Sequence, residues 1–238
     1  MTDLRGALAS PETKARYVRR LFDTIADRYD LITVLLSFGR DRSWKKRLVN
    51  LANVRQGSRA LDLACGTGDI AFALADCGAQ VTGLDITLRM LRIARSKGRV
   101  PFVAGDMTSL PFPDAAFDIV TAGYGIRNVP RIQPAINEIH RVLRPGGTFV
   151  SLDFDRPSNA IVRAVYLGYL NVVGSALGWL LHGNADTYRY IPASISRYPG
   201  AAAVSSLLEH SGFEGCRVVA LLGGLMAINV ARSRPRAD

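Results

Sequence analysis

Asp62-Leu-Ala-Cys-Gly-Thr-Gly68 is the stretch that decides the fold. It closes the buried-strand pattern Ser58–Leu63 and leads into an apolar helix pattern around Asp69–Ala75, so it forms a strand-to-helix turn. Gly66 and Gly68 allow a ligand to approach the backbone closely. The N-terminus of the following helix favours a negative group such as a carboxylate. The turn therefore indicates a binding site at the carboxyl edge of a sheet.

Strand and helix patterns alternate from Ser58 onward, which predicts an α/β fold with a parallel sheet covered on both faces. Near the end of the chain two apolar runs are joined by Gly223-Gly224, a strong hairpin signal. The sheet should therefore finish with an antiparallel strand, whereas a dinucleotide-binding sheet finishes parallel. The further strands expected are Gln80–Leu84, Val100–Ala104, Phe117–Ala122, Thr148–Phe154, Val218–Leu222 and Leu225–Val230, with a helix over Arg131–Leu143.

Two segments lie outside this core. Residues 12–53 have the pattern of two amphipathic helices, and residues 158–182 are mainly apolar. From Ala164 to Leu181 the apolar stretch is long enough to cross a membrane, but crossing would separate strands of one sheet. We expect instead a helical lid over an apolar pocket, in a position to touch a bilayer. The expected parts are an N-terminal helical segment (1–57), a cofactor-binding core (58–155), the lid insertion (156–199), and a C-terminal helix with a hairpin (200–238).

Acidic residues stand at the ends of three successive strands. Asp62 precedes Gly66 and Gly68 by four and six positions, which matches the acidic-x-Gly-x-Gly-x-Gly pattern of class I S-adenosylmethionine-dependent methyltransferases, with Ala64 in the first glycine position. The Gly-x-Gly-x-x-Gly pattern of NAD enzymes fails, because Ala71 stands in its last position. This pattern predicts S-adenosylmethionine as the cofactor.

The second and third acidic residues extend the predicted cofactor site. Asp85 follows Gly68 by 17 residues and can accept hydrogen bonds from both ribose hydroxyls. Asp106 can accept from the adenine amino group while Met107 packs on the ring, although Asp106 taken alone is more often a turn residue. The expected cofactor contacts are completed by Thr67, Ile86 and Gly123.

The chain carries 30 Lys and Arg against 20 Asp and Glu, a net charge of +10. Residues 1–60 hold 13 of these basic residues and only 6 acidic ones. Nucleic acid, an anionic membrane surface and a merely solvated basic face all fit this charge, and composition alone favours the last. The three cysteines are far apart with no histidine cluster, so neither a zinc site nor a disulfide framework is expected.

Several motifs resemble one family over nearly the whole chain, from about residue 15 to 232. The segment from Tyr29 to Trp44, Gly125-Ile-Arg-Asn-Val129 and Tyr188-Arg-Tyr-Ile-Pro-Ala-Ser194 are similar to signatures of the ubiquinone/menaquinone biosynthesis C-methyltransferase family. The closing Gly223-Gly224 also matches. Two positions differ: Thr33 stands where the family has Asn, and Asp41 where it has His.

The resemblance implies a Rossmann-like class I methyltransferase that methylates a ring carbon of a polyprenylated hydroquinone. We expect Arg127 to stabilise the phenolate and Asn128 to orient a ring oxygen. Asp153 is the candidate base, with a structural ion pair as an equally good interpretation. The predicted substrate-binding residues, some of which can equally be pocket wall, are Tyr29, Thr33, Tyr124, Tyr188 and Tyr190.

The predicted location is cytoplasmic, peripheral on the inner face of the membrane, with oligomerisation open. An RNA methyltransferase is a rival that the basic charge suggests, but Gly123-Tyr-Gly-Ile-Arg-Asn128 lacks base-flipping machinery, so no nucleic-acid partner is expected. Thr33 and Asp41 keep open another lipophilic phenol or a small metabolite as substrate. A non-catalytic cofactor-binding subunit is the remaining alternative.

Overall fold

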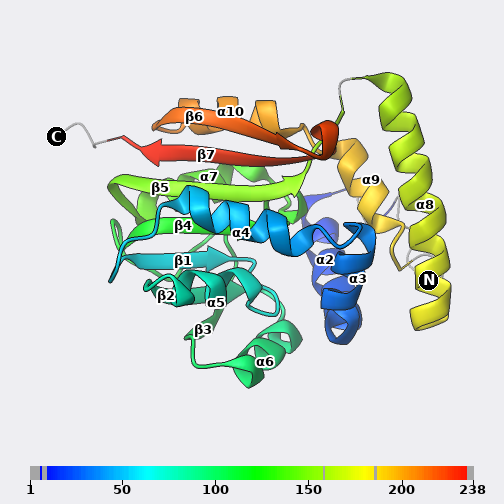
Figure 1. The fold of residues 1–238 in the computed structure, drawn as a ribbon, viewed down its shortest axis with the longest axis horizontal. Helices are drawn as coiled ribbons and strands as arrows, with labels where there is room; N and C mark the ends of the chain where they lie inside the picture. Colours follow the sequence, from blue (N-terminus) through cyan, green and yellow to red (C-terminus); the bar gives the residue numbers. More distant parts are fainter. Residues whose placement is uncertain (1–5, 7–9, 158, 185–186, 235–238) are drawn as a thin grey trace.

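The computed structural model describes residues 6, 10–157, 159–184 and 187–234. A seven-stranded sheet runs through the molecule in the order β3-β2-β1-β4-β5-β7-β6, with helices on both faces (Figure 1). Its strands are β1 (Arg59–Leu63), β2 (Gln80–Asp85), β3 (Phe102–Ala104), β4 (Phe117–Gly123), β5 (Leu143–Phe154), β6 (Phe213–Leu221) and β7 (Met226–Ser233).

Every neighbouring pair from β3 to β5 is parallel, and β7 pairs antiparallel with both β5 and β6. The predicted Rossmann-like sheet with an antiparallel last strand is confirmed. The strand order reverses between β1 and β4, and a crevice at such a point, outside the carboxyl ends of the strands, is where α/β sheets bind ligands.

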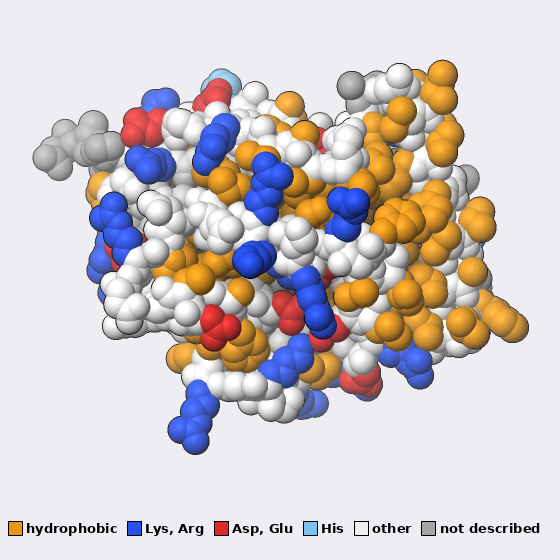
Figure 2. Space-filling view, viewed as in Figure 1, with side chains coloured by type: hydrophobic (Ala, Val, Ile, Leu, Met, Phe, Trp, Pro, Cys, Tyr) orange, Lys and Arg blue, Asp and Glu red, His pale blue; other side chains and the backbone are white. Residues whose placement is uncertain are grey.

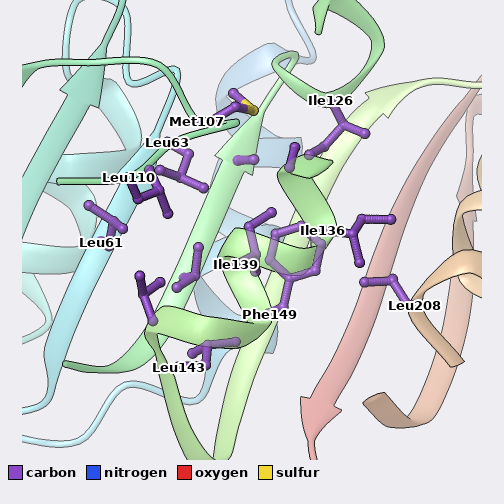
Figure 3. Close-up of a cluster of buried hydrophobic side chains, with 14 of the residues drawn as sticks. Leu61, Leu63, Met107, Leu110, Ile126, Ile136, Ile139, Leu143, Phe149 and Leu208 are labelled. Carbon is purple, nitrogen blue, oxygen red and sulfur yellow. The ribbon is translucent and has the colours of Figure 1, made fainter. Parts of the chain in front are cut away.

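The helices that cover the sheet are α4 (Asp41–Ala52), α5 (Asp69–Asp76), α6 (Leu88–Lys97), α7 (Ile132–Val142) and α10 (Ala201–His210). Below one face a buried cluster includes Leu61, Leu63, Ile136, Ile139 and Phe149 (Figure 3). A second cluster on the other face includes Trp44 and Leu48 of α4. In β1, β4 and β5 neighbouring residues enter opposite clusters, as in Ala60 and Leu61, Ile119 and Val120, and Phe149 and Val150, which explains the near-continuous apolar patterns of these strands.

Within residues 10–53, which the structure describes, there are three α-helices where the sequence predicts two over residues 12–53. After α2 (Pro11–Ile25), a short turn leads into α3 (Tyr29–Leu36), and then α4 begins. Helix α2 starts at a capping box, in which Ser10 accepts from the Thr13 amide and Thr13 Oγ1 accepts from the Ser10 amide. The break falls at Ala26–Arg28, which an apolar periodicity carried across 12–53 does not reveal.

The predicted lid is the long helix α8 (Ala160–His182), followed by α9 (Tyr190–Arg197). The two helices stand with α2 and α3 beyond the carboxyl ends of the strands (Figure 1). Tyr166, Leu170, Tyr188 and Tyr190 join residues of α2 and α3 in a third buried cluster. The N-terminal and lid segments therefore share one core, although 123 residues lie between the end of α3 at Leu36 and the start of α8 at Ala160.

Candidate active site

A cavity of about 740 Å³, including its open mouth, lies at the carboxyl ends of the central strands. Six of the predicted cofactor residues line it: Gly66, Asp85, Ile86, Asp106, Met107 and Gly123. Helix α2 and the segment that follows β4 close its other side, through residues such as Val18, Phe22 and Val129. The sequence thus predicted the residues at the strand ends that line this cavity, but not the residues of α2 that close it.

The turn after β1 has the backbone conformation that its glycines suggest. Gly66 has φ +53° and Gly68 has φ +92°. The buried carboxylate of Asp85 accepts from the Gly66 amide at 2.8 Å and from the Thr87 amide at 2.8 Å. Asp85 therefore ties the first helix turn after β2 to the loop after β1 and still lines the cavity.

Asp62, Thr67 and Gly68 are the three predicted cofactor residues outside the cavity lining. Asp62 Oδ1 accepts from Thr121 Oγ1 at 2.7 Å, while Oδ2 is buried without a hydrogen-bond partner among the described residues. Burial raises the pKa of this carboxyl to about 7, against the opposing effect of Thr121. Thr67 Oγ1 donates to Asp30 of α3 at 2.6 Å, and Gly68 caps α5.

Asp106 fits both of its interpretations. Its carboxylate accepts from the amide and hydroxyl of Thr108, each at 2.8 Å, which is an Asx-turn. The same side chain lines the cofactor cavity next to Met107.

A second cavity, about 770 Å³ with its open part, lies beside the first. Phe22, Tyr29 and Tyr124 line both cavities, so they form the wall between them. All five predicted substrate-binding residues line the second cavity, together with Arg127 and many apolar side chains of α2, α3, α8 and α9. Burial raises the pKa of Tyr29 and of Tyr188 to about 12, so both phenols are protonated at neutral pH.

The side chain of Arg127 is buried and contacts Asp153, Ser194 and Phe154. Its Nε donates to Asp153 Oδ1 at 3.1 Å, its Nη1 donates to Ser194 Oγ, and its guanidinium carbon stands 5.1 Å from the centre of the Phe154 ring. Asp153 also accepts from the amides of Arg127 and Phe154 and does not belong to the residues lining either cavity. The structure therefore has the ion pair that the alternative interpretation gives to Asp153, and its role as the base stays a prediction.

Asn128 bridges the predicted site residues. Its Nδ2 donates to the Tyr124 carbonyl at 2.7 Å, and its Oδ1 accepts from the Tyr190 hydroxyl at 3.0 Å. Lys14 of α2 donates to the carbonyls of Arg127 and Val129, at 3.1 and 2.6 Å, and its burial lowers the pKa of the Lys14 ammonium to about 8. Lys14 was missed from the sequence, since a single lysine on an amphipathic helix gives no sign of its partners.

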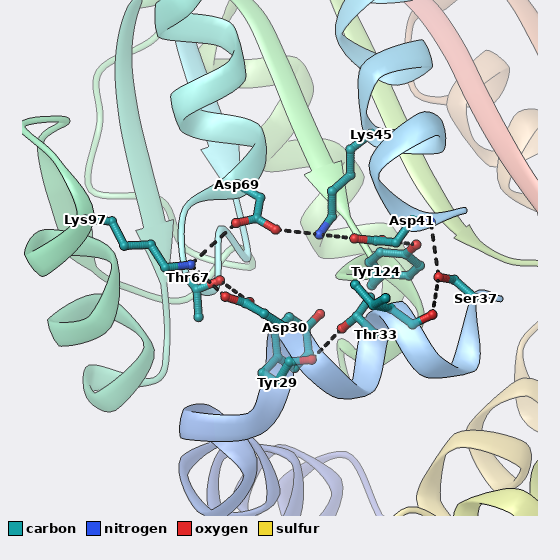
Figure 4. A network of polar contacts seen from close by, with 11 residues as sticks. Tyr29, Asp30, Thr33, Ser37, Asp41, Lys45, Thr67, Asp69, Lys97 and Tyr124 are labelled. Atoms are coloured by element: carbon teal, nitrogen blue, oxygen red, sulfur yellow. Dashed lines mark hydrogen bonds and ion pairs between the residues drawn. The ribbon is translucent and has the colours of Figure 1, made fainter. Parts of the chain in front are cut away.

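A polar network missed from the sequence connects α3 and α4 to the cofactor loop (Figure 4). Asp41 accepts from the Tyr124 hydroxyl at 2.7 Å and pairs with Lys45 at 2.6 Å. Lys45 also forms an ion pair with Asp69, with 2.9 Å between Nζ and Oδ2. The other carboxylate oxygen of Asp69 lies 3.5 Å from Lys97 Nζ. Burial alone would lower the pKa of Lys45, but the carboxylates of Asp41 and Asp69 outweigh it and raise the pKa above the usual value. The departure from the family pattern at Asp41 was the one available signal.

Comparison with known proteins shows to which family this chain belongs. Residues 10–233 match the model of the ubiE/COQ5 methyltransferase family. The chain belongs to the ubiE/COQ5 methyltransferase family. Its relatives in this family include a demethylmenaquinone methyltransferase of Thermus thermophilus, 42% identical over 88% of this chain and 98% of the relative. Another is the ubiquinone/menaquinone biosynthesis C-methyltransferase UbiE of Azotobacter vinelandii, 37% identical over 94% of this chain and 93% of the relative.

Solved structures with the same fold lie further away in sequence. A Thermotoga maritima S-adenosylmethionine-dependent methyltransferase, described as a possible histamine N-methyltransferase, has a TM-score of 0.69 at 19% identity and covers 91% of this chain and 100% of its own. The [4+2]-cyclase SpnF has a TM-score of 0.60 at 22% identity, covering 92% and 97%. These likenesses show the fold alone, because one fold supports many reactions.

Family and fold together make this chain an S-adenosylmethionine-dependent methyltransferase of quinone biosynthesis. The residues present fit the cofactor. A Cβ at position 68 would lie 2.7 Å from Phe72 Cε2, so the loop depends on glycine there. Acceptor oxygens of Asp85 and Asp106 line the cavity at the ends of adjacent strands, and Asp62 Oδ2 is a buried acceptor under the loop with no partner among the described residues.

Proposed function

We propose that this enzyme transfers a methyl group from S-adenosylmethionine to a ring carbon of a polyprenylated hydroquinone. The observation that carries the proposal is the pair of adjoining cavities. One is floored by the cofactor loop and lined by the acidic strand ends, and the other is mainly apolar with Arg127 in its wall. A ring at the shared wall of Phe22, Tyr29 and Tyr124 would face the cofactor, while an apolar tail would extend among α2, α3 and α8.

The cofactor contacts follow from the polar atoms of the first cavity. The Asp85 carboxylate would accept from the ribose hydroxyls, and Asp106 from the adenine amino group beside Met107. The positive end of the α5 dipole, at the loop that contains Gly66 and Gly68, would attract the methionine carboxylate. When bound, S-adenosylmethionine supplies an electrophilic methyl group on a sulfonium.

The protein must position the ring and favour its ionised form. Arg127 cannot act as a base because guanidinium does not lose its proton in proteins, but it stabilises a phenolate. Its Nη2 has no hydrogen-bond partner among the described residues, whereas Nε and Nη1 hold Asp153 and Ser194. We assign Asp153 and Ser194 the role of fixing the guanidinium plane at the wall of the second cavity. Loss of the ring hydroxyl proton to water would raise the electron density on the ortho carbon. That carbon would take the methyl group as the methyl–sulfur bond breaks and S-adenosylhomocysteine leaves, and loss of the proton from the same carbon would restore the aromatic ring.

We also infer a peripheral position on the membrane. Among the described residues, α8 is a helix long and apolar enough to cross a bilayer, with 22% of its most apolar window buried. Its outward side chains Ile161, Val165, Val172, Trp179 and Leu180 are exposed, as are Leu31, Leu35 and Phe38 at α3. Phe38 stacks on Tyr169 of α8 at 5.4 Å, and Figure 2 shows apolar side chains gathered over this end of the molecule. A lipid tail could thus enter the second cavity from the bilayer, since Phe38 and Leu36 also line it.

The test is incubation with methyl-labelled S-adenosylmethionine and reduced, short-tailed demethylated quinones of both benzenoid and naphthalenoid type, followed by product mass spectrometry. Both rings are included because the relatives' names cover both. We expect one added methyl on a ring carbon. Cofactor binding without methyl transfer to either ring would overturn the proposed substrate and leave the family assignment intact.

A further inference from the structure

Two tyrosines that line the second cavity, Tyr124 and Tyr190, have hydroxyl protons that are donated to other groups of the protein. Tyr124 Oη lies 2.7 Å from Asp41 Oδ1, and a carboxylate paired with Lys45 can only accept. Tyr124 must therefore donate its single proton to Asp41. The oxygen of Tyr124 is left with lone pairs, which accept hydrogen bonds from a ligand but cannot give one.

The same argument applies to Tyr190. Asn128 faces the Tyr124 carbonyl on one side, and a carbonyl only accepts, so the amide nitrogen of Asn128 must point to it. The amide oxygen then faces Tyr190, whose hydroxyl donates at 3.0 Å. Tyr190 is 1% exposed, and burial keeps its pKa above the usual value, so it is protonated and its proton is also committed.

We propose that Tyr124 and Tyr190, held as acceptors by Asp41 and Asn128, make the site selective for the reduced, hydroxyl-bearing ring over the oxidised quinone. The inference rests on the proposed quinol substrate and assigns its redox selectivity to named residues. A hydroquinone hydroxyl can donate a hydrogen bond to either phenol oxygen. A quinone carbonyl is itself only an acceptor, so neither phenol oxygen could form a hydrogen bond with it. Unsatisfied buried acceptors are costly, so each such mismatch weakens binding by roughly 10-fold or more.

The contacts of Asp41 support a role in selecting the reduced ring, beyond a role in packing. Asp41 is 2% exposed, and its partner Lys45 is also held by Asp69, so the carboxylate is fixed in position against the Tyr124 hydroxyl. Tyr124 has φ +58°, a left-handed conformation that is unfavourable for a side chain of this size. Its amide donates to the Leu152 carbonyl at 2.7 Å, which helps to hold that conformation and places the ring at the wall that both cavities share.

The experiment compares equilibrium binding of a short-tailed demethylated naphthoquinone and of its anaerobically reduced form to the full chain with S-adenosylhomocysteine present. Quenching of Trp44 fluorescence reports binding, because Trp44 lines the second cavity, and a Trp179→Phe background removes the exposed indole of α8. We expect the quinone to bind at least 10-fold more weakly than the quinol. In Asp41→Asn the amide can donate to Tyr124, whose proton then turns to the cavity, so the ratio should fall toward 1. Tyr124→Phe should also lower the ratio, by weakening quinol binding.

Asp23→Asn is the matched control, since Asp23 is an exposed carboxylate on α2, and it should keep the wild-type ratio. A wild-type ratio near 1, or an unchanged ratio in Asp41→Asn and Tyr124→Phe, overturns the inference. If Asp41→Asn does not fold, the ratio of quinone to quinol binding in Tyr124→Phe is sufficient to test the inference. Quinol methylation with no redox selectivity refutes this inference only, whereas absence of both binding and methylation refutes the proposed substrate as well.

Discussion

At the scale of single residues, Gly68 shows how the cofactor loop constrains its own sequence. Its φ of +92° disfavours any side chain, and a Cβ would also lie 2.7 Å from Phe72 Cε2 and 3.1 Å from Phe102 Cζ. We expect Gly68→Ala to weaken S-adenosylmethionine binding at least 10-fold and to lower the free energy of unfolding by about 1–3 kcal/mol.

Isothermal titration and urea unfolding measure both effects. Gly57→Ala is the control, because Gly57 also has a positive φ of +79° but a Cβ there would have no atom within 4 Å. The comparison therefore separates the cost of backbone strain from the cost of the contact between a Cβ at position 68 and Phe72. Equal cofactor affinity in the two variants would show that the loop tolerates a side chain at position 68.

Asp62 makes stability depend on pH. Its folded-state pKa of about 7 lies above that of an unfolded aspartate, so the folded state favours the neutral form. The stability that the neutral Asp62 carboxyl gives the folded state is fully present below about pH 4 and is lost as the pH rises through 7. Its size is on the order of 1.4 kcal/mol for each unit by which the folded-state pKa exceeds the unfolded-state pKa. Asp62→Asn cannot ionise, so its stability relative to wild type should increase from pH 4.5 to 7.5. Urea unfolding of the cofactor-free protein at both pH values measures this difference, with Asp76→Asn, at an exposed carboxylate of α5, as the matched control.

At the scale of elements, α3 is attached to the cofactor loop by a few polar contacts. Asp30 accepts from Thr67 Oγ1 at 2.6 Å and pairs with Lys97 of α6 at 2.7 Å. The side chains of Asp30 and Lys97 are 45% and 33% exposed, so the ion pair contributes little by itself. Together the contacts place α3 against the loop that the cofactor must reach.

We expect Asp30→Ala to raise the dissociation rate of S-adenosylmethionine by about 2- to 5-fold, because a surface contact contributes less than about 1 kcal/mol. Stopped-flow displacement measures the rate. Glu214→Gln breaks another exposed ion pair, between Glu214 of β6 and Arg234 just after β7, and should leave the dissociation rate unchanged. An unaltered rate in Asp30→Ala would mean that α3 does not restrain the cofactor.

At the scale of the whole molecule, exposed basic residues and an apolar face are both available for a membrane. The predicted basic N-terminal quarter is only partly free, because Lys14 and Lys45 are used in internal contacts. The exposed basic side chains there include Arg16, Arg19, Arg20, Arg28, Arg40, Arg42, Lys46 and Arg47. Each such residue near an anionic surface contributes about 1 kcal/mol.

We expect the protein to float with phosphatidylglycerol-containing liposomes, more weakly with pure phosphatidylcholine, and less in high salt. Replacing Trp179 and Leu180 together by Asp should remove most of the binding, since both side chains are about 70% exposed on α8. Val218→Asp changes an exposed apolar residue of β6 and should have no effect. Equal flotation of all variants would place the docking face elsewhere.

Much of the fold and the cofactor floor could be predicted from the sequence because the signals are local. The strand–loop–helix unit around Gly66 and Gly68, the acidic strand ends at Asp85 and Asp106, and the Gly223-Gly224 hairpin each depend on residues close in the chain. Periodicity fixes which face of an element is apolar, and parallel strands bring their carboxyl ends to one edge. The loop Asp62–Gly68, with its cofactor, was therefore determined by the sequence alone.

Only the tertiary structure decided how the substrate side is built. Tyr124 meets Asp41 across 83 positions, Arg127 meets Ser194 across 67, and the lid and N-terminal helices form one core. No periodicity encodes such pairs, because a hydrogen bond between distant residues depends on how whole helices pack and leaves no pattern in either segment. That packing placed Asp153 against Arg127 and Asp41 against Tyr124.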